Sequence, residues 1–436
     1  MEWKNQKGPM QDESDGRIGR PDFLSLYIHV PFCRKKCPYC DFFSVTDLSW
    51  VNAYAAGVCK EIQLWSAMAG SWSRMPVHTI YFGGGTPSLL SAGQMQQILD
   101  KVQNCFRLVS GAEITCEVNP GTVDALYLKD LRQLGINRLS IGAQSFDPKK
   151  LLFLSRIHTR KQVFDTLEDA ARAGFSNLGL DLMYGLPGES QDTWQRDLYT
   201  ALGFYPAHLS CYMLTIEPGT PFFDWCEKGL FLPCDRDRRI EFFVQTSEIL
   251  ENCGYIHYEV SNFALGPKNQ SVHNSHYWHR GAYLGMGPSA HSFLPGKIKN
   301  DKAYNRFQQG PLPFGASGPV RSWNAANLHA WLERIAAGIL PKEDYETLTP
   351  AQEILEQVML GLRTEQGIQI NNLDRDVQTL MATLEAQGMG ILSMSEGTAD
   401  TDRRFRLTRT GMTCLDSVVD AVARKIFDKM DFYDNL

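Results

Sequence analysis

Hydrophobic residues along the chain form short runs that are separated by longer amphipathic stretches. Six runs rich in β-branched and aromatic residues predict strands at 23–30, 77–83, 112–118, 137–143, 177–185 and 207–214. The intervals between them carry helical periodicity at 51–68, 91–106, 122–135, 159–174 and 190–203. Strands that alternate with helices indicate βαβ units and a parallel sheet. The pattern therefore predicts an α/β protein with a full or partial (β/α)6-type barrel.

The pattern changes towards the carboxyl end of the chain. Residues 261–323 are rich in Gly, Pro, Asn and His, and we expect an irregular segment packed against the barrel mouth. Helical periodicity returns from residue 324, and the order helix, turn, two short strands, helix then predicts a mainly helical, winged-helix-like domain over 324–436. The polar residues 1–22 predict a disordered tail, which leaves 23–260 for the barrel.

Charge and hydropathy exclude several classes of protein. The net charge of −6 argues against a protein that coats nucleic acid, and the helical segment 369–388 carries Asp374, Asp376 and Glu385 against the single cation Arg375. No apolar run reaches the ~18–20 residues of a transmembrane helix. The start has no apolar segment of a secretory signal. We therefore expect a cytoplasmic protein that binds no nucleic acid.

Three of the 11 cysteines lie together directly after the first predicted strand. Cys33, Cys37 and Cys40 have the spacing C-x3-C-x2-C, and clustered thiols in a reducing compartment are typically metal ligands or redox groups. Thiolates are the usual ligands of iron–sulfur clusters, and three of them on a four-iron cluster leave one iron open. Zinc with a remote fourth ligand, and redox or inert thiols, are the alternatives. The other cysteines are scattered, as buried small residues are.

Polar and glycine-rich segments follow the later predicted strands in the same way. They are 83–87, 117–120, 142–146 and 181–189. Because the carboxyl ends of parallel strands meet at one rim of a barrel, these segments should converge on the cysteine loop. Asp181 is the least ordinary residue among them, because it lies in the otherwise apolar run 177–185. Burying a carboxylate costs free energy, so its presence there indicates a function.

The segments YIHVPFCRKKCPYCDF, YFGGGTPS, EVNP, GAQSF and DLMYGLPGE resemble the motifs of the radical S-adenosylmethionine (SAM) superfamily, and within it those of oxygen-independent coproporphyrinogen III oxidase and its HemW-type relatives. The resemblance implies a partial (β/α)6-type radical SAM barrel with a [4Fe-4S] cluster on Cys33, Cys37 and Cys40, and SAM at the open iron. It further implies SAM contacts at Tyr27, Gly84, Gly85, Thr86, Glu117, Gln144, Arg156 and Asp181. In the oxidase the positions of the last three are associated with a second SAM.

Two features separate the branches of this family. The oxidase has a further Cys two residues after the cluster loop, where this chain has Phe42. HNSHYW at 273–278 resembles the HNxxYW motif of HemW-type proteins, which is linked to haem and points to His273 as its ligand. His276 and His279 nearby are its rivals, and the following segment with His291 also fits the family.

The resemblance thus predicts a HemW-type haem chaperone that carries haem as cargo to an unidentified acceptor protein, with a membrane-associated acceptor among the candidates. The alternative is an anaerobic oxidase that decarboxylates coproporphyrinogen III to protoporphyrinogen IX.

Overall fold

The computed structural model describes residues 23–68, 75–295, 318–371, 373–394 and 403–433. The predicted disordered tail 1–22 lies outside these residues. Within them, no helix is long and apolar enough to cross a membrane.

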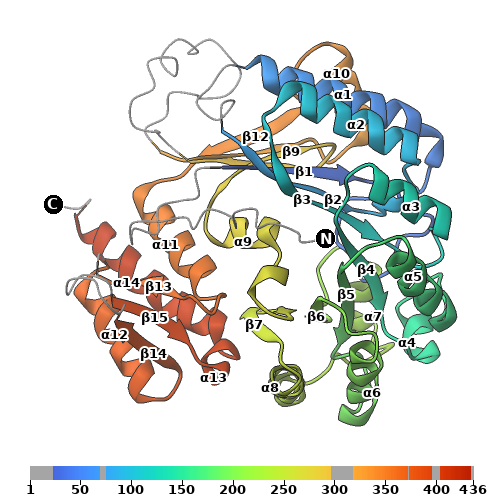
Figure 1. Ribbon diagram of the computed structural model, residues 1–436. Helices are drawn as coiled ribbons and strands as arrows, with labels where there is room; N and C mark the ends of the chain where they lie inside the picture. Colours follow the sequence, from blue (N-terminus) through green and yellow to red (C-terminus); the bar gives the residue numbers. More distant parts are fainter. Residues whose placement is uncertain (1–22, 69–74, 296–317, 372, 395–402, 434–436) are drawn as a thin grey trace, which may run out of the picture.

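A twelve-stranded sheet forms the larger part of the molecule (Figure 1). Its order is β12-β11-β10-β9-β1-β2-β3-β4-β5-β6-β8-β7, and the seven strands from β9 to β6 are parallel. The strands are β1 (Leu24–Val30), β2 (Val77–Gly84), β3 (Leu108–Val118), β4 (Arg138–Gln144), β5 (Asn177–Tyr184), β6 (His208–Met213), β7 (Ile256–Glu259), β8 (Asn262–Ala264), β9 (Ala282–Met286), β10 (His291–Leu294), β11 (Val320–Asn324) and β12 (Lys342–Thr347). The six predicted strands are therefore confirmed as β1 to β6.

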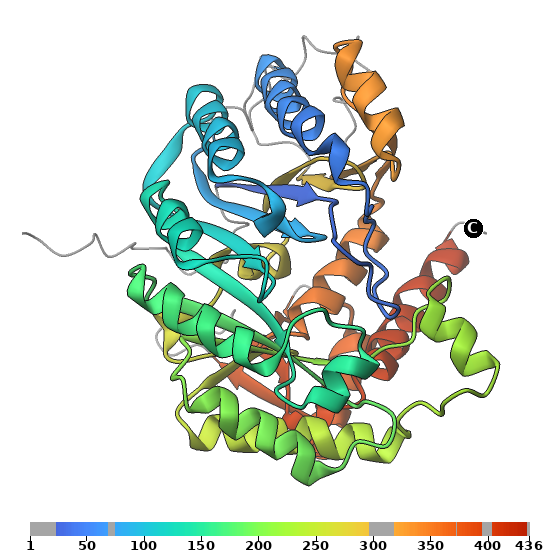
Figure 2. The same ribbon diagram turned by 90° about the vertical axis from the view of Figure 1, so that its right-hand side faces the viewer.

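Helices cover the outer face of this sheet, as Figures 1 and 2 show. They are α1 (Val51–Ala67), α2 (Ala92–Cys105), α3 (Ala125–Gln133), α4 (Pro148–Phe153), α5 (Arg160–Arg172), α6 (Gln191–Leu202), α8 (Arg236–Asn252) and α10 (Leu328–Ala336). The short helix α7 (Pro221–Glu227) lies instead beside the cysteine loop, where Phe222 N donates to Pro38 O. The five predicted helices are confirmed as α1, α2, α3, α5 and α6. Ser91 and Thr159 begin α2 and α5 with capping boxes, which satisfy backbone N–H groups of the first turn.

The core lies between the sheet and these helices. In β1, six of the seven residues are buried, because a central parallel strand is covered on both faces. Leu26, Ile28, Phe82, Ile141 and Leu180 are fully buried in this core. The strand ends, and the loops that follow them, are thereby held in fixed positions at one rim.

The segment 261–323 was expected to be irregular, and for its described residues this expectation is wrong. It contains α9 (Val272–Trp278) and the strands β9, β10 and most of β11, which extend the sheet next to β1. Its glycines serve close packing: a Cβ on Gly285 would lie 2.0 Å from the His291 carbonyl oxygen. The glycine content that suggested irregular structure therefore reflects tight strand pairing. The large sheet also takes in β12, beyond residue 324.

The carboxyl-terminal unit has its own small core around Val358, Met381, Phe405 and Val422. Its elements are α11 (Pro350–Gly361), β13 (Ile368–Gln369), α12 (Arg375–Ala386), β14 (Gly390–Met394), β15 (Arg403–Leu407), α13 (Arg409–Met412) and α14 (Leu415–Tyr433). The predicted order of helix, two strands and helix is confirmed from α12 onwards. Backbone hydrogen bonds from Val260 N to Arg363 O and from Glu365 N to Tyr258 O attach this unit to the end of β7.

Candidate cofactor-binding site

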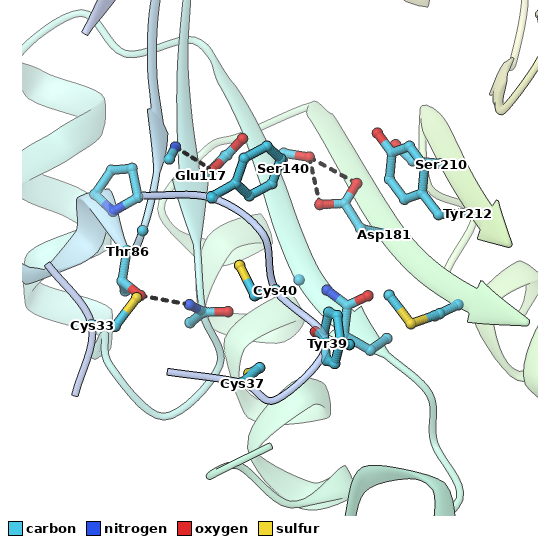
Figure 3. Close-up of a pocket in the computed structure, with 18 of the residues that line it drawn as sticks. Cys33, Cys37, Tyr39, Cys40, Thr86, Glu117, Ser140, Asp181, Ser210 and Tyr212 are labelled. Atoms are coloured by element: carbon cyan, nitrogen blue, oxygen red, sulfur yellow. Dashed lines mark hydrogen bonds between the residues drawn. The ribbon is translucent and has the colours of Figure 1, made fainter. Parts of the chain in front are cut away.

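The three clustered cysteines lie on the loop that leaves β1, seen as the dark blue loop of Figure 2. The loop folds back on itself through hydrogen bonds from Cys33 N to Val45 O, 2.9 Å, and from Val45 N to Pro31 O, 2.7 Å. All three thiols are free and partly exposed, and they line one cavity of about 560 Å³ (Figure 3). Three soft sulfur ligands therefore face one enclosed space.

The glycine-rich turn after β2 packs against the root of this loop. Gly85 N donates to Val30 O over 2.8 Å, and a Cβ on Gly85 would lie 2.7 Å from the Phe32 carbonyl oxygen. Gly84 has a φ of +107°, which side-chain-bearing residues rarely adopt. The hydroxyl of Thr86 lies 3.7 Å from Cys33 Sγ. Only glycines let the two chain segments approach this closely beside the thiols.

Two half-buried carboxyl groups, Glu117 and Asp181, line the cavity from β3 and β5 (Figure 3). Glu117 accepts hydrogen bonds from Tyr81 Oη at 2.9 Å and from Gly84 N at 3.1 Å. Ser140 Oγ lies 3.0 Å from both oxygens of Asp181. Burial, and then the nearby Asp181, raise the pKa of Glu117 to about 8, and burial raises the pKa of Asp181. A cationic ligand in this cavity would lower the pKa of both groups and so favour their ionised forms.

Arg156 joins the cysteine loop to the end of β4. Its Nη1 lies 3.7 Å from Cys37 Sγ, and its Nη2 donates to the Gly142 carbonyl over 2.9 Å and to Asn119. Gln144 closes β4 with a φ of 63°, an uncommon conformation for a residue with a side chain and one that recurs at functional sites. The Arg156 guanidinium is thus fixed beside the Cys37 thiol, and Gln144, with its unusual backbone conformation, lines the same cavity.

Burial also affects the thiols themselves. It raises the pKa of Cys33 and of Cys40, so in the ligand-free protein these two groups are protonated at neutral pH. Metal binding must displace those protons, and loading of the site is therefore expected to release protons and to weaken in acid.

The cavity extends from the cysteine loop down through the sheet. Arg138 and His208, the first residues of β4 and β6, line its lower part together with Ser271 and Asn274 of the α9 region. At about 560 Å³ the cavity has the size of pockets that hold small-molecule ligands.

Comparison with known proteins places these features in a family. A family profile described as "Radical SAM superfamily" matches residues 27–198. The heme chaperone HemW of Synechocystis sp. is 34% identical over 407 residues, which covers 88% of this chain and 92% of the relative. The chain belongs to the HemW family. HemW of Escherichia coli is 42% identical over 280 residues, covering 63% of this chain and 72% of the relative.

A solved structure shares the fold of this chain. Coproporphyrinogen III oxidase (HemN) of Escherichia coli superimposes with a TM-score of 0.72 at 21% identity, covering 93% of this chain and 92% of that one. At this identity the likeness shows the fold alone: a mixed α/β structure with a large, mostly parallel sheet. The predicted fold class is confirmed at that level.

Ten of the residues that the family resemblance points to line the cavity: Cys33, Cys37, Cys40, Gly84, Gly85, Thr86, Glu117, Gln144, Arg156 and Asp181. The other two do not. Tyr27 donates its hydroxyl to His29 Nδ1 over 3.2 Å and packs beside the Tyr81 ring, one layer behind the wall. His273 lies on α9 outside the cavity.

Both ring nitrogens of His273, the first histidine of the HNSHYW segment, already form hydrogen bonds within the chain. His273 Nδ1 lies 2.7 Å from Thr79 Oγ1, and its Nε2 lies 2.7 Å from the hydroxyl of Tyr277. The ring is 1% exposed, and burial lowers its pKa well below the usual range, so it is neutral. Iron ligation by His273 would require one of these hydrogen bonds to open.

The other three histidines within residues 273–291 differ in access. His276 is buried and hydrogen bonds the Ala282 carbonyl at 2.8 Å, while its ring stacks on Phe23. His291 is exposed and its ring lies against Trp323. His279 is half-buried, with one hydrogen bond to an exposed residue, Gln366, at 3.0 Å. Of these three histidines, only His279 has a side chain that is partly buried and partly accessible to a ligand.

Several polar residues that line the cavity were not predicted from the sequence, among them Ser140, Ser210 and Arg138. Ser140 and Ser210 bind Asp181 from the neighbouring strands β4 and β6. For two of them a signal existed: Arg138 and Ser140 lie at even spacing from the recognised Gln144 along β4, which predicts the same face of the strand. Ser210 lies on β6, where no motif was recognised.

Proposed function

We propose that this chain binds a [4Fe-4S] cluster through Cys33, Cys37 and Cys40, binds SAM beside it, and carries haem to an acceptor protein. Membership of the HemW family supports the proposal, since the relatives are named heme chaperones. The observation that carries it is the convergence of three free thiols, the glycine turn at Gly85 and two half-buried carboxyl groups on one cavity.

The residues present fit these cofactors. A three-thiol loop leaves one iron of a cluster without a protein ligand, and such a cluster supplies the electron for reductive chemistry on SAM. Arg156 places a positive charge next to Cys37, which would offset the negative charge of thiolate ligands. The side-chain-free turn at Gly84 and Gly85 allows close approach of an amino-acid group, and Glu117 is placed to accept from its ammonium.

The other proposed SAM contacts surround the same space. Thr86, Gln144 and Asp181 line the walls, while Tyr27 would support them from behind through its contact with Tyr81. For haem, the resemblance points to His273, whose hydrogen bonds to Thr79 and Tyr277 would have to rearrange.

We also propose that the carboxyl-terminal unit is a winged-helix-like domain that docks a protein partner. Its separate core and its order of helix, two strands and helix support this. The division into 23–260, 261–323 and 324–436 is retained as a proposal about folding units, although β11 and β12 join the large sheet. The acceptor is an unidentified protein, with a membrane-associated one among the candidates.

Anaerobic reconstitution tests the cluster. We expect about four iron and four sulfide per chain, because a cubane cluster has that composition. Cys33→Ala, Cys37→Ala and Cys40→Ala should each lose it. Cys253→Ala is the matched control, since this exposed cysteine lies at the end of α8, outside the residues lining the cavity. Stoichiometric zinc in place of iron, or equal loss in the control, would contradict the assignment.

Transfer of haem is measured by mixing the haem-loaded chain with an apo haem protein and following the acceptor's Soret band. The oxidase alternative gains support from the size of the cavity, and it is tested by incubation with SAM, a reductant and coproporphyrinogen III under anaerobic conditions. We expect no protoporphyrinogen. Phe42, which stands where the oxidase has Cys, is 65% exposed at the cavity mouth. Appearance of the decarboxylated product would favour the oxidase over the chaperone.

A further inference from the structure

A second cavity of about 470 Å³ lies where α9 meets the carboxyl-terminal unit. One wall comes from Trp278 and His279, at the end of the HNSHYW segment. The facing wall comes from Pro350 and Ile354 of α11 and from Ile368 of β13. We call this space the interdomain groove. It is separate from the cysteine-lined cavity, and no residue lines both.

We propose that the interdomain groove binds haem, with His279 as the iron ligand. This inference rests on the proposed function, because it takes haem to be the cargo, and it gives that cargo a site. It departs from the expectation that the histidine beginning the motif, His273, binds the iron.

The two histidines differ in what they can offer iron. An axial ligand must present a ring nitrogen to an open space large enough for the porphyrin. His273 is fully buried with both nitrogens in 2.7 Å hydrogen bonds. His279 lines the groove, and the only hydrogen bond of its ring among the described residues goes to the exposed amide of Gln366. Displacing one exposed amide costs less than opening a hydrogen bond of a fully buried ring.

The chemistry of the groove matches a flat apolar ring with two carboxylates. Trp278, Ile354 and Ile368 supply apolar and aromatic surface of the kind that covers a porphyrin face. Trp278 Nε1 is buried and has no hydrogen-bond partner among the described residues, so it could donate to a ligand carboxylate. Such an orphan donor in a cavity wall is costly unless a ligand satisfies it.

The charges on the rim are mixed, with cations in excess. Arg280 and Arg404 line the groove, and Glu353 is the carboxylate among its lining residues. Arg280 lies 3.8 Å from Glu353 and 3.3 Å from Glu356, whereas Arg404 donates to the carbonyls of Gln366 and Gly367. Both arginines line the groove, and a guanidinium is the usual partner of a carboxylate such as a haem propionate.

The structure gives His273 a different role, that of a positioning residue. Its bonds to Thr79 of β2 and to Tyr277 fix α9 on the sheet, and the stacked ring of Tyr81 holds it from the side. Because α9 is only two turns long, these contacts determine where the next residues, Trp278 and His279, emerge. The motif can thus matter for haem without its first histidine touching iron.

Titration of the full chain with hemin, followed by the Soret band and by resonance Raman spectra of the iron–histidine bond, tests this. We expect His279→Ala to weaken hemin binding by about tenfold or more and to lose the histidine-ligated spectrum, which added imidazole should restore. His329→Ala, an exposed histidine on α10, is the matched control and should behave as wild type. Ile354→Trp, which fills the groove but keeps His279, should also weaken binding.

His273→Ala separates the two assignments. A positioning role predicts weaker binding with the histidine-ligated spectrum preserved. Loss of that spectrum in His273→Ala, together with its retention in His279→Ala, would overturn the inference. If wild type binds no hemin, the proposed haem function itself fails; if wild type binds while His279→Ala and Ile354→Trp are both unchanged, only the interdomain groove is wrong. Circular dichroism confirms that each variant is folded.

Discussion

Glu117 makes the stability of the ligand-free protein depend on pH in a direction that can be measured. The perturbation is Glu117→Gln, which keeps the shape of the side chain and an oxygen that can accept from Gly84 N or Tyr81 Oη. In the folded chain the pKa of Glu117 is about 8, against 4.5 for an ordinary glutamate, because the group is buried near Asp181. The folded state therefore holds a proton that the unfolded state releases above pH 4.5.

The magnitude follows from linkage. Because the folded pKa is raised, the stabilising contribution of the protonated carboxyl is fully present below pH 4.5 and is lost as the pH rises through about 8. At 1.36 kcal/mol per pH unit, the whole difference is about 5 kcal/mol, of which about 3 kcal/mol falls between pH 5.5 and 8.5. Wild type should lose that much unfolding free energy relative to Glu117→Gln over this interval.

Urea unfolding of metal-free protein, followed by circular dichroism at a series of pH values, measures the effect. The quantity of interest is the difference between wild type and variant, since other buried carboxyl groups such as Glu61 titrate equally in both. Glu333→Gln, on the exposed face of α10, is the control and should leave the pH slope of wild type unchanged. Parallel pH profiles for wild type and Glu117→Gln would refute the reasoning.

Two further predictions concern packing and charge. Gly85→Ala should reduce the iron retained after reconstitution several-fold, because the new Cβ would lie 2.7 Å from the Phe32 carbonyl oxygen and push the cysteine loop away. Gly93→Ala is the control and should retain as much iron as wild type, because its Cβ would meet one atom at 4.0 Å. Equal iron content in both variants would contradict this prediction. Lys150→Met should lower the free energy of unfolding by about 3–5 kcal/mol in urea titrations, because two buried carboxylates then lose the ammonium that binds them. Lys161→Met, which breaks an exposed pair, should leave the free energy of unfolding close to that of wild type, and similar losses in both variants would show that burial is not the cause.

The parallel strands and their rim were predictable because their signals are local. β1 and β2 are buried over most of their length and read as nearly continuous apolar runs in the sequence. The polar residues that follow such runs must meet at one edge, and Glu117, Asp181 and the cysteines do so. β9 escaped prediction because it has five residues, contains Gly285, and is flanked by glycines that read as loop.

The placement of the motif histidine was not predictable, because it depends on distant contacts. His273 is buried by its bond to Thr79, 194 positions earlier, and by the ring of Tyr81. Nothing in the HNSHYW segment itself distinguishes a histidine that ligates from one that anchors its helix. The interdomain groove likewise exists only because α11 and β13 close over the end of α9.

The position of β1 in the sheet has a consequence for biosynthesis. β1 lies between β2 and β9, and its partner residues in β9 come about 250 positions later, at Ala282–Met286. At roughly 5–20 residues per second, a ribosome takes roughly 10–50 s to deliver them after β1 has emerged. During that interval one edge of β1 carries unpaired backbone groups, which is a hazard for aggregation. The strand that bears the cysteine loop is thus completed late, so cofactor loading is expected to follow synthesis of β9 rather than accompany that of the loop.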